Sequence, residues 1–223
     1  MQTRLSELQC WSDQWQLTIS YKKCSVSLLN NVKGGHHANL VLGDKEVSQP
    51  DCVKDLGVLT DQHLKFEEHI NHTVTRANRV ANLIHKCFIS KDLTTLMKAY
   101  TTYVRPIMEY ASCIWSPHTV GLTKKIESVQ RRFTKRLPCC CDLTYSERLA
   151  KLQLHSLELR RLRFDLIYAY NIIFGILETD VFFFTISSTN NFTRGHNLKL
   201  LMPQSRIDVR KYFFACRNCA LLE

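Results

Sequence analysis

The stretch from residue 105 to residue 133, RPIMEYASCIWSPHTVGLTKKIESVQRRF, decides how the chain is organised. Its Arg-Pro pair is expected to close one helix, its Trp-Ser-Pro sequence to form a turn, and Gly121 to open a second helix. In that second helix, apolar residues recur at intervals of 4, 3, 4 and 4 residues, the period of a helix face packed on a core. They are Leu122, Ile126, Val129, Phe133 and Leu137.

The other face of this predicted helix is cationic. Its basic residues are Lys124, Lys125, Arg131, Arg132, Lys135 and Arg136. The chain has a net charge of +10, and residues 121–163 hold eleven Lys or Arg against four Asp or Glu, a net of +7. Such clustering favours a polyanionic partner bound in a salt-sensitive manner. The alternative is a solvated helix surface without a partner.

The same residues resemble the region that follows the catalytic palm in reverse transcriptases of non-LTR (LINE-type) retrotransposons, of the jockey and chicken-repeat kind. The family pattern VRP-x-hydrophobic-EY-x-x-x-x-W-x-P corresponds to residues 104–117, and IE-x-VQRRFT corresponds to residues 126–134. Residues 146–175 also match the family pattern. The resemblance covers about residues 5–214 and implies a fragment of an RNA-directed DNA polymerase that includes its thumb.

Two N-terminal segments acquire roles through this resemblance. Residues 11–24 are similar to motif D, whose lysine is thought to assist the departing pyrophosphate, and Lys23 corresponds to that lysine. Residues 55–58 resemble motif E, the primer grip, a hairpin that holds the primer 3′ end. The resemblance therefore implies that Leu56, Gly57 and Val58 contact nucleic acid, where a glycine permits close approach of the backbone.

The sequence predicts an α+β fold in three parts. They are a small antiparallel β remnant of a polymerase palm edge (1–62), a mostly α-helical thumb-like bundle (63–178) and a poorly defined C-terminal tail (179–223). In the first part, we expect a helix with inward Leu and Trp residues and a hairpin turning at Gly43-Asp44. The helix is expected at 3–15 and the hairpin at 40–47. Three further strands are expected at 15–20, 24–29 and 53–60.

The period becomes helical after residue 61. An apolar seam is formed by Ile70, Val74, Ala77, Ala81, Ile84 and Phe88. Asp92 and Ser156 are suitable N-caps for later helices. The helix after Ser156 is expected to bury one row and to expose its arginines. The row is Leu159, Leu162, Leu166, Tyr170 and Ile173, and the arginines are Arg160, Arg161 and Arg163.

The catalytic groups of the resembled family are missing from this sequence. Two-metal nucleotidyl transfer needs carboxylates that hold two divalent ions about 4 Å apart. The resemblance implies that these come from a motif A Asp and the Asp pair of a YxDD box, yet no two Asp residues are adjacent here. We therefore predict no catalytic residue, metal site or cofactor on this chain, and Mg²⁺ would be bound by palm carboxylates of a longer product.

The cysteines and the hydropathy of the chain limit the hypotheses about its location, zinc binding and membrane association. The ten cysteines are scattered and no signal peptide is recognised, so we expect free thiols and an intracellular location, cytoplasmic or nuclear. A zinc module would require Cys139–Cys141 to meet Cys216 and Cys219 in space. The most apolar segment, residues 166–186, contains two carboxylates near its middle, so no membrane association is expected.

Two main hypotheses follow. The first is a polymerase fragment that binds an RNA–DNA hybrid or RNA and whose other partner is the missing palm region. The second is an inert helical scaffold, a degenerate retroelement-derived product without activity. They differ in whether the basic residues of 121–137 and of 148–163 converge on one face.

Overall fold

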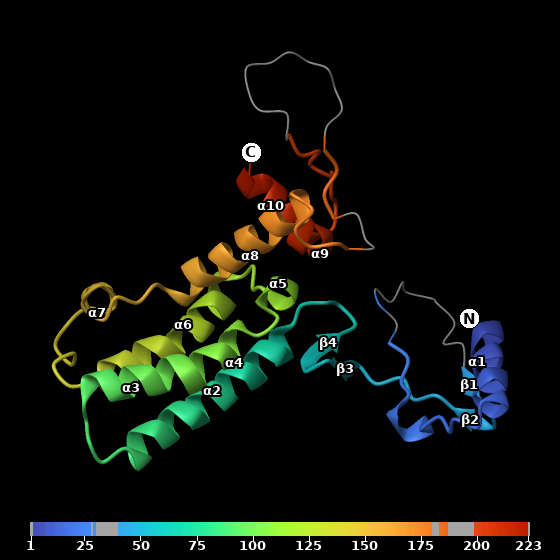
Figure 1. Ribbon diagram of the computed structural model, residues 1–223, viewed down its shortest axis with the longest axis horizontal. Helices are drawn as coiled ribbons and strands as arrows, with labels where there is room; N and C mark the ends of the chain where they lie inside the picture. The colour runs from blue at the N-terminus through green and yellow to red at the C-terminus, as the bar shows by residue number, and fades with distance from the viewer. Residues whose placement is uncertain (1, 28, 30–39, 180–182, 187–198, 223) are drawn as a thin grey trace. The chain divides into compact units, whose positions relative to one another are not determined.

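The chain forms two compact units, Met1–Phe66 and Glu67–Glu223 (Figure 1). The computed structural model describes residues 2–27, 29, 40–179, 183–186 and 199–222. The first unit consists of two small sheets and one α-helix, and the second is a helical bundle. This composition agrees with the predicted α+β class.

The N-terminal unit is built from one helix and two antiparallel hairpins. Its elements are α1 (Gln2–Gln14), η1 (Tyr21–Lys23), β1 (Val41–Leu42), β2 (Lys45–Glu46), β3 (Cys52–Asp55) and β4 (Val58–Asp61). The β1–β2 hairpin turns at Gly43-Asp44, as predicted, with Gly43 at φ +62°. The Gln2 side chain fixes α1 to β1 because its amide both donates to the Val41 carbonyl (2.7 Å) and accepts from the Val41 amide (3.0 Å).

The predicted inward face of α1 is wrong. Leu8 and Trp11 are 44% and 49% exposed, and the residue of α1 that is buried is Ser12. The predicted strand at 15–20 is also wrong, because Gln16 takes φ +54° and the Leu17 amide bonds back to the Ser12 carbonyl (3.0 Å). The chain therefore turns after α1 where we expected it to extend.

The other two predicted strands are corrected as well. Of residues 24–29, Ser25 forms a single isolated bridge with Ser48, and residue 28 lies outside the described residues. Residues 53–60 are not one strand but most of the β3–β4 hairpin, in which Cys52 pairs with Asp61. Leu56 and Gly57 form its turn at φ +44° and +89°, so Gly57 is a turn residue and not a bulge. A hairpin is the form that the motif E resemblance implies.

The second unit is a helical bundle. Its elements are α2 (Glu67–Cys87), α3 (Leu93–Ala99), η2 (Tyr100–Val104), α4 (Arg105–Glu109), α5 (Ser112–Trp115), α6 (Val120–Lys135), α7 (Tyr145–Lys151), α8 (Leu157–Ile173), α9 (Asp208–Lys211) and α10 (Phe214–Leu222). The segments α3, η2 and α4 follow each other without a break and form one rod. Helix α2 packs along both this rod and α6, while α8 packs on α5 and α6 (Figure 1).

The core of the bundle contains the two predicted apolar stripes. In α2, the seam residues from Ile70 to Ile84 are buried, whereas Phe88 lies beyond the helix end and is 37% exposed. In α6, Ile126, Val129 and Phe133 are at most 1% exposed, as is Leu137 just after the helix, while Leu122 is half-buried. Both amphipathic predictions are therefore confirmed along most of their length.

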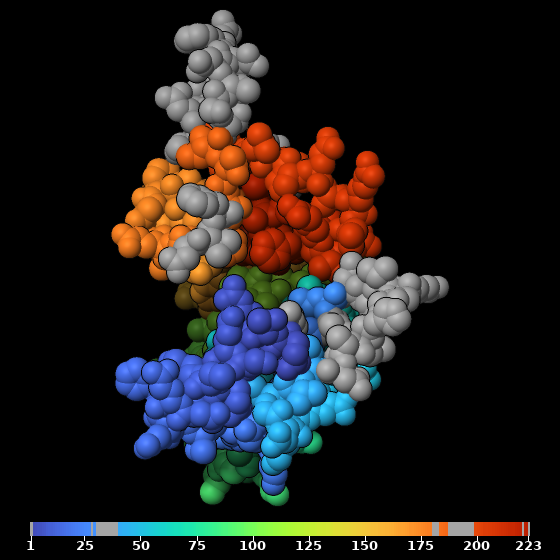
Figure 2. Space-filling model, turned by 90° about the vertical axis from the view of Figure 1, so that its right-hand side faces the viewer, coloured from blue at the N-terminus to red at the C-terminus, as the bar shows by residue number. Residues whose placement is uncertain are grey.

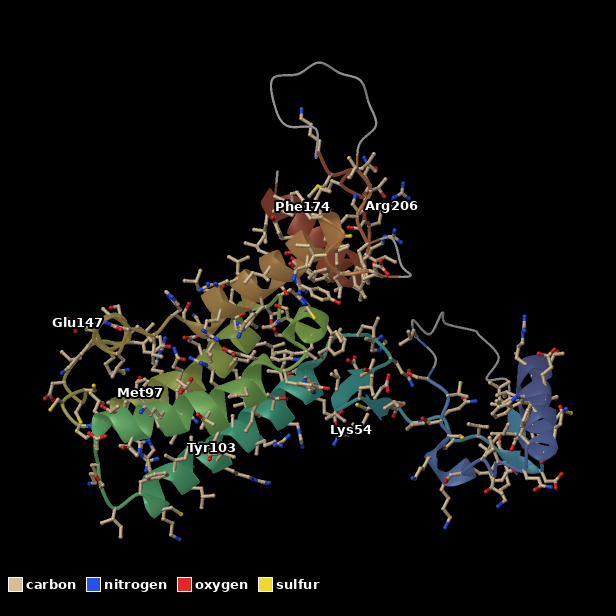
Figure 3. All side chains as sticks on the ribbon, in the orientation of Figure 1. Lys54, Met97, Tyr103, Glu147, Phe174 and Arg206 are labelled. Carbon is tan, nitrogen blue, oxygen red and sulfur yellow. The ribbon has the colours of Figure 1, made fainter. Side chains whose placement is uncertain are left out.

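The Arg105-Pro106 pair does not close a helix as predicted. The rod continues through it to Glu109 because η2 is a π-helical turn, in which the Arg105 amide bonds to the Tyr100 carbonyl five residues earlier. A proline lacks the amide hydrogen that an α-helix needs, and a widened preceding turn relieves its clash with the backbone. Tyr103 projects from this turn and is 61% exposed (Figure 3).

Polar caps fix where the later helices begin. The predicted caps are confirmed, since Asp92 accepts from the Thr95 amide (2.8 Å) and Ser156 from the Leu159 amide (3.2 Å). At α7, Thr144 and Glu147 form a reciprocal capping box (Figure 3).

Helix α8 buries a different row from the one predicted. Its buried residues are Leu157, Arg161, Asp165 and Ala169, whereas Leu159 and Tyr170 are 48% and 53% exposed. The buried Asp165 carboxylate is tolerated because Arg217 of α10 forms an ion pair with it (2.9 Å). The last helices and the end of α8 form one continuous mass (Figure 2).

Candidate nucleic-acid interface

All six cations predicted to contact nucleic acid on α6 are exposed. Successive residues of an α-helix are rotated by about 100°, so these cations form two adjacent rows. The outer row is Lys124, Arg131 and Lys135, and the inner row is Lys125, Arg132 and Arg136. The outer row lies opposite the buried stripe and the inner row lies between the outer row and the stripe, and neither row contains a carboxylate.

The inner row is attached to α2 by two asparagines. The Lys125 ammonium donates to the side-chain oxygen of Asn71, and the Arg136 guanidinium donates to that of Asn82 (2.7 Å). Both pairs are separated by 54 residues, so α2 and α6 run parallel and in register over three turns. The junction of the two helices is therefore polar and rich in donors.

A groove of about 360 Å³ lies at this junction, around the Asn82–Arg136 pair. It is lined by Asn78, Ala81, Asn82, His85, Val129, Arg132, Phe133, Lys135 and Arg136. Three of these residues are cations and none is acidic. On the solvent side of α2, the exposed residues Arg79 and Lys86 lie about a quarter turn from the asparagine row. We call the two cation rows, the asparagine row (Asn71, Asn78 and Asn82), Arg79 and Lys86 together the α2–α6 face.

His85 lies at the base of this groove. Its ring stands 4.5 Å from that of Phe133, and its Nε2 is buried without a hydrogen-bond partner among the described residues. Burial first, and then the charge of Arg136, lower the pKa of His85, and a hydrogen bond to the Phe133 backbone opposes them. His85 is therefore neutral near pH 7.

The polar residues of the IE-x-VQRRFT pattern have mainly structural contacts. Gln130 is fully buried, and it accepts from the Tyr100 hydroxyl (2.7 Å) and donates to the Tyr145 hydroxyl (3.1 Å) and the His155 carbonyl (3.0 Å). The Glu127 carboxylate accepts from the Tyr145 hydroxyl and from the Leu157 amide (3.0 Å) at the start of α8. Burial and then the Glu127 hydrogen bond raise the pKa of Tyr145, so this phenol stays neutral.

The basic residues of 148–163 do not join the α2–α6 face as a group. Arg148 is buried and donates to the Thr134 hydroxyl (3.2 Å) and the Leu143 carbonyl (2.7 Å). Arg161 is 3% exposed, and Arg160 forms an ion pair with Glu109. The predicted exposure of Arg161 is therefore wrong. Arg148 and Arg161 are buried in the bundle, and Arg160 is paired within it.

The N-terminal site residues lie in the other unit. Leu56, Gly57 and Val58 meet at the end of the β3–β4 hairpin, where Leu56 is 85% exposed and Val58 is buried. Lys23 is exposed in η1 and belongs to a different element. The roles of these residues stay predictions from resemblance.

The described residues contain neither a metal-binding cluster nor a membrane-spanning helix. In that part of the chain, no three His, Cys, Asp or Glu side chains lie close enough to bind a metal ion together. The zinc hypothesis thus receives no support from Cys139–Cys141 and the cysteines of α10. None of the described helices combines the length and apolarity needed to cross a membrane.

The contribution of α2 to the interface was missed by sequence reasoning. Asn71, Asn78, Asn82 and His85 are spaced 7, 4 and 3 residues apart, which places them on one edge of the apolar seam. That spacing is visible in the sequence. Its meaning depends on a parallel neighbour with cations at matching positions, which only the fold reveals.

Two known proteins are similar to part of this chain. An uncharacterised protein of Caenorhabditis elegans is 26% identical over 126 residues, which are 55% of this chain and 64% of that protein. A probable RNA-directed DNA polymerase from transposon X-element of Drosophila melanogaster is 24% identical over 133 residues, which are 58% of this chain and 14% of that protein. The chain thus spans less than two thirds of either relative.

The second similarity supports a relationship to retrotransposon polymerases, distant and over part of the chain. No protein-family model matches the chain. No solved structure is significantly similar to it.

Proposed function

We propose that this chain is a portion of a LINE-type RNA-directed DNA polymerase whose helical unit binds the sugar–phosphate backbone of an RNA–DNA hybrid or of RNA. The observation that carries the proposal is the α6 surface, with six exposed cations in two rows and no carboxylate in either. Contacts of this kind position a nucleic acid and carry no sequence preference.

The dimensions of the surface suit this role. From Lys124 to Arg136 the helix rises about 18 Å, since each residue adds about 1.5 Å. Along one strand of a duplex, phosphates recur about every 3.4 Å of axis, so the two rows span about five phosphates. Six cations facing about five phosphates is a matched density of charge.

The binding test is fluorescence anisotropy with a labelled RNA–DNA hybrid over a salt series. We would replace Lys124 and Lys135 by Gln, because neither side chain has a hydrogen bond or ion pair with the described residues. The matched control replaces the exposed Arg163 and Arg206 by Gln, which removes the same net charge elsewhere. We expect the outer-row variant to bind more weakly and its log–log salt slope to fall by about 1.5, from about 0.7–0.9 per lost contact. Equal losses in both variants would show that net charge alone matters.

Catalysis is proposed to depend on a palm region outside this sequence. Two divalent ions need carboxylates that no adjacent Asp pair supplies here. We expect the purified chain not to extend a primed RNA template with nucleotides and Mg²⁺ or Mn²⁺. Extension by protein free of other polymerases would refute this part of the proposal.

A second candidate function is an inert helical scaffold. It is favoured by the inward arginines of 148–163, since Arg148, Arg160 and Arg161 contribute to packing and not to a cationic face. The same binding experiment separates the two candidates. Absence of binding at low salt, together with a helical circular dichroism spectrum, would favour the scaffold.

A further inference from the structure

We propose that the groove between α2 and α6 is a site for one phosphate of a nucleic-acid strand, held jointly by Arg132 and Lys135 of α6 and by Asn78 of α2. This inference rests on the proposed function. It adds a second helix to the interface and fixes where one backbone phosphate sits.

The lining of the groove is cationic and rich in hydrogen-bond donors. The groove brings three cations, two side-chain amides and one imidazole together within about 360 Å³, and none of its lining residues is acidic. A phosphate offers several strong acceptor oxygens, and a guanidinium binds two of them through parallel N–H donors. A site that is rich in donors and poor in acceptors selects an anion.

The side chains of Asn71 and Asn82 are oriented by the cations that they bind. The Asn82 oxygen accepts the hydrogen bond from Arg136 (2.7 Å), so its oxygen is already used. Its NH₂ group, with two donors, is then the end left to the groove. Asn71 is arranged in the same way by Lys125. Asn82 thus presents its donors to the groove beside Arg136, the cation that it holds in place.

Two cations of the groove are free to bind a ligand. Arg132 and Lys135 form no hydrogen bond or ion pair with the part of the protein that the structure describes, and both are exposed. Lys125 and Arg136, by contrast, are held by asparagines three turns apart. The cations able to turn toward a ligand are therefore Arg132 and Lys135, two of the three that line the groove.

The floor of the groove is apolar. Ala81, Val129 and Phe133 are buried, and the unpartnered Nε2 of His85 is buried among the described residues. An apolar floor lowers the local dielectric, which strengthens the attraction between a phosphate and its cations.

The flanks of the groove explain why the phosphate belongs to a polymer. Lys124 and Arg131 continue the cationic surface on one side, and Arg79 and Lys86 continue it on the other. A free phosphate would need none of these residues. A strand running across the α2–α6 face would place neighbouring phosphates at both flanks.

The decisive experiment compares two substitutions of equal charge. Asn78→Asp puts a carboxylate into the groove, while Asn171→Asp makes the same change at a half-buried residue of α8 that neither lines the groove nor belongs to the α2–α6 face. Anisotropy with a labelled RNA–DNA hybrid is expected to show at least tenfold weaker binding for Asn78→Asp and less than threefold for Asn171→Asp. Circular dichroism melting of both variants checks that the fold is retained.

A direct readout uses the side-chain amide signals of Asn78 and Asn82 in ¹H–¹⁵N spectra of the wild-type chain. We expect both to shift on titration with the hybrid and to shift little with inorganic phosphate alone. Saturable shifts with inorganic phosphate but not with hybrid would overturn the polymer assignment. Hybrid binding with unmoved amides and equal effects of the two substitutions would refute the groove while leaving the proposed function intact. No binding by the wild-type chain would refute both.

Discussion

The first prediction concerns Gln130, which joins three elements of the bundle. Replacing it by Leu keeps a side chain of similar size but removes the acceptor for the Tyr100 hydroxyl (2.7 Å) and the donor to the His155 carbonyl (3.0 Å). Tyr100 is fully buried, so its hydroxyl has no access to water. Tyr145 retains its hydrogen bond to Glu127 and loses less.

The expected cost follows from these partners. A buried polar group left without a hydrogen bond costs about 1–3 kcal/mol, and this applies in full to Tyr100. The His155 residue is exposed, so water can satisfy its carbonyl and its share is small. We expect Gln130→Leu to lower the free energy of unfolding by about 2–4 kcal/mol, out of about 5–15 kcal/mol for a typical domain.

The assay is urea denaturation followed by circular dichroism at 222 nm, combined with Tyr100→Phe in a double-mutant cycle. Tyr100→Phe should cost about 1 kcal/mol in the wild-type chain and be neutral or stabilising beside Gln130→Leu, because it then removes a stranded hydroxyl. Ser128→Ala is the control, since that hydroxyl bonds only its own helix (2.7 Å to the Lys125 carbonyl). Strict additivity of the two changes, or a loss below about 0.5 kcal/mol, would refute the reasoning.

Three further predictions follow from local features. Leu56→Asn should stabilise the β3–β4 hairpin by about 0.5 kcal/mol, seen as slower amide exchange in its strands, because Asn tolerates the φ of +44° before Gly57 better than Leu does. Burial first, and then His72, hold the pKa of His69 below its ordinary 6.5. As the pH falls, the unfolded chain therefore binds this proton at a higher pH than the folded chain does. The melting temperature should therefore fall as the pH falls below about 6.5, and His69→Gln should reduce that fall, as calorimetry from pH 7.5 to about 5.5 would show. Arg217→Met should cost about 3 kcal/mol in urea denaturation by leaving Asp165 unpaired, and Asp165→Asn should restore part of it.

Much of the helical unit could be predicted from periodicity alone. The seam from Ile70 to Ile84 and the stripe from Ile126 to Phe133 are buried as the spacing indicates. The cap at Asp92 also follows from local chemistry, since its carboxylate accepts from an amide three residues on. Features set by neighbours within one or two turns are legible in a sequence because few alternatives compete with them.

The predictions that failed depend on contacts or backbone geometry that the local sequence pattern does not show. Arg161 and Asp165 look like surface residues in α8, but Arg217, 52 residues beyond Asp165, makes burial of the carboxylate tolerable. Pro106 looks like a helix end, and the π-helical turn before it allows the rod to continue. In α1, an amphipathic pattern was assigned an inward face although Leu8 and Trp11 are exposed.

The sequence predicted the α6 half of the candidate site and not the α2 half. Charge and period placed the six cations of α6 on one face, and they are all exposed. The asparagines of α2 were not predicted as site residues, because a neutral polar residue beside an apolar seam has many ordinary roles. Their part depends on register, since Asn71 and Asn82 meet Lys125 and Arg136 only if the helices are parallel at an offset of 54 residues.

The contacts also separate two kinds of information in the family pattern. Glu127, Gln130 and Phe133 lie within IE-x-VQRRFT and are buried, where they cap α8, join α7 and fill the core. Arg132 lies within the same pattern and is exposed at the groove. The buried members would be retained by any chain that keeps this fold, whether or not it binds nucleic acid. The resemblance at those positions therefore argues for the fold, and the argument for binding depends on the exposed arginine and its partners across the groove.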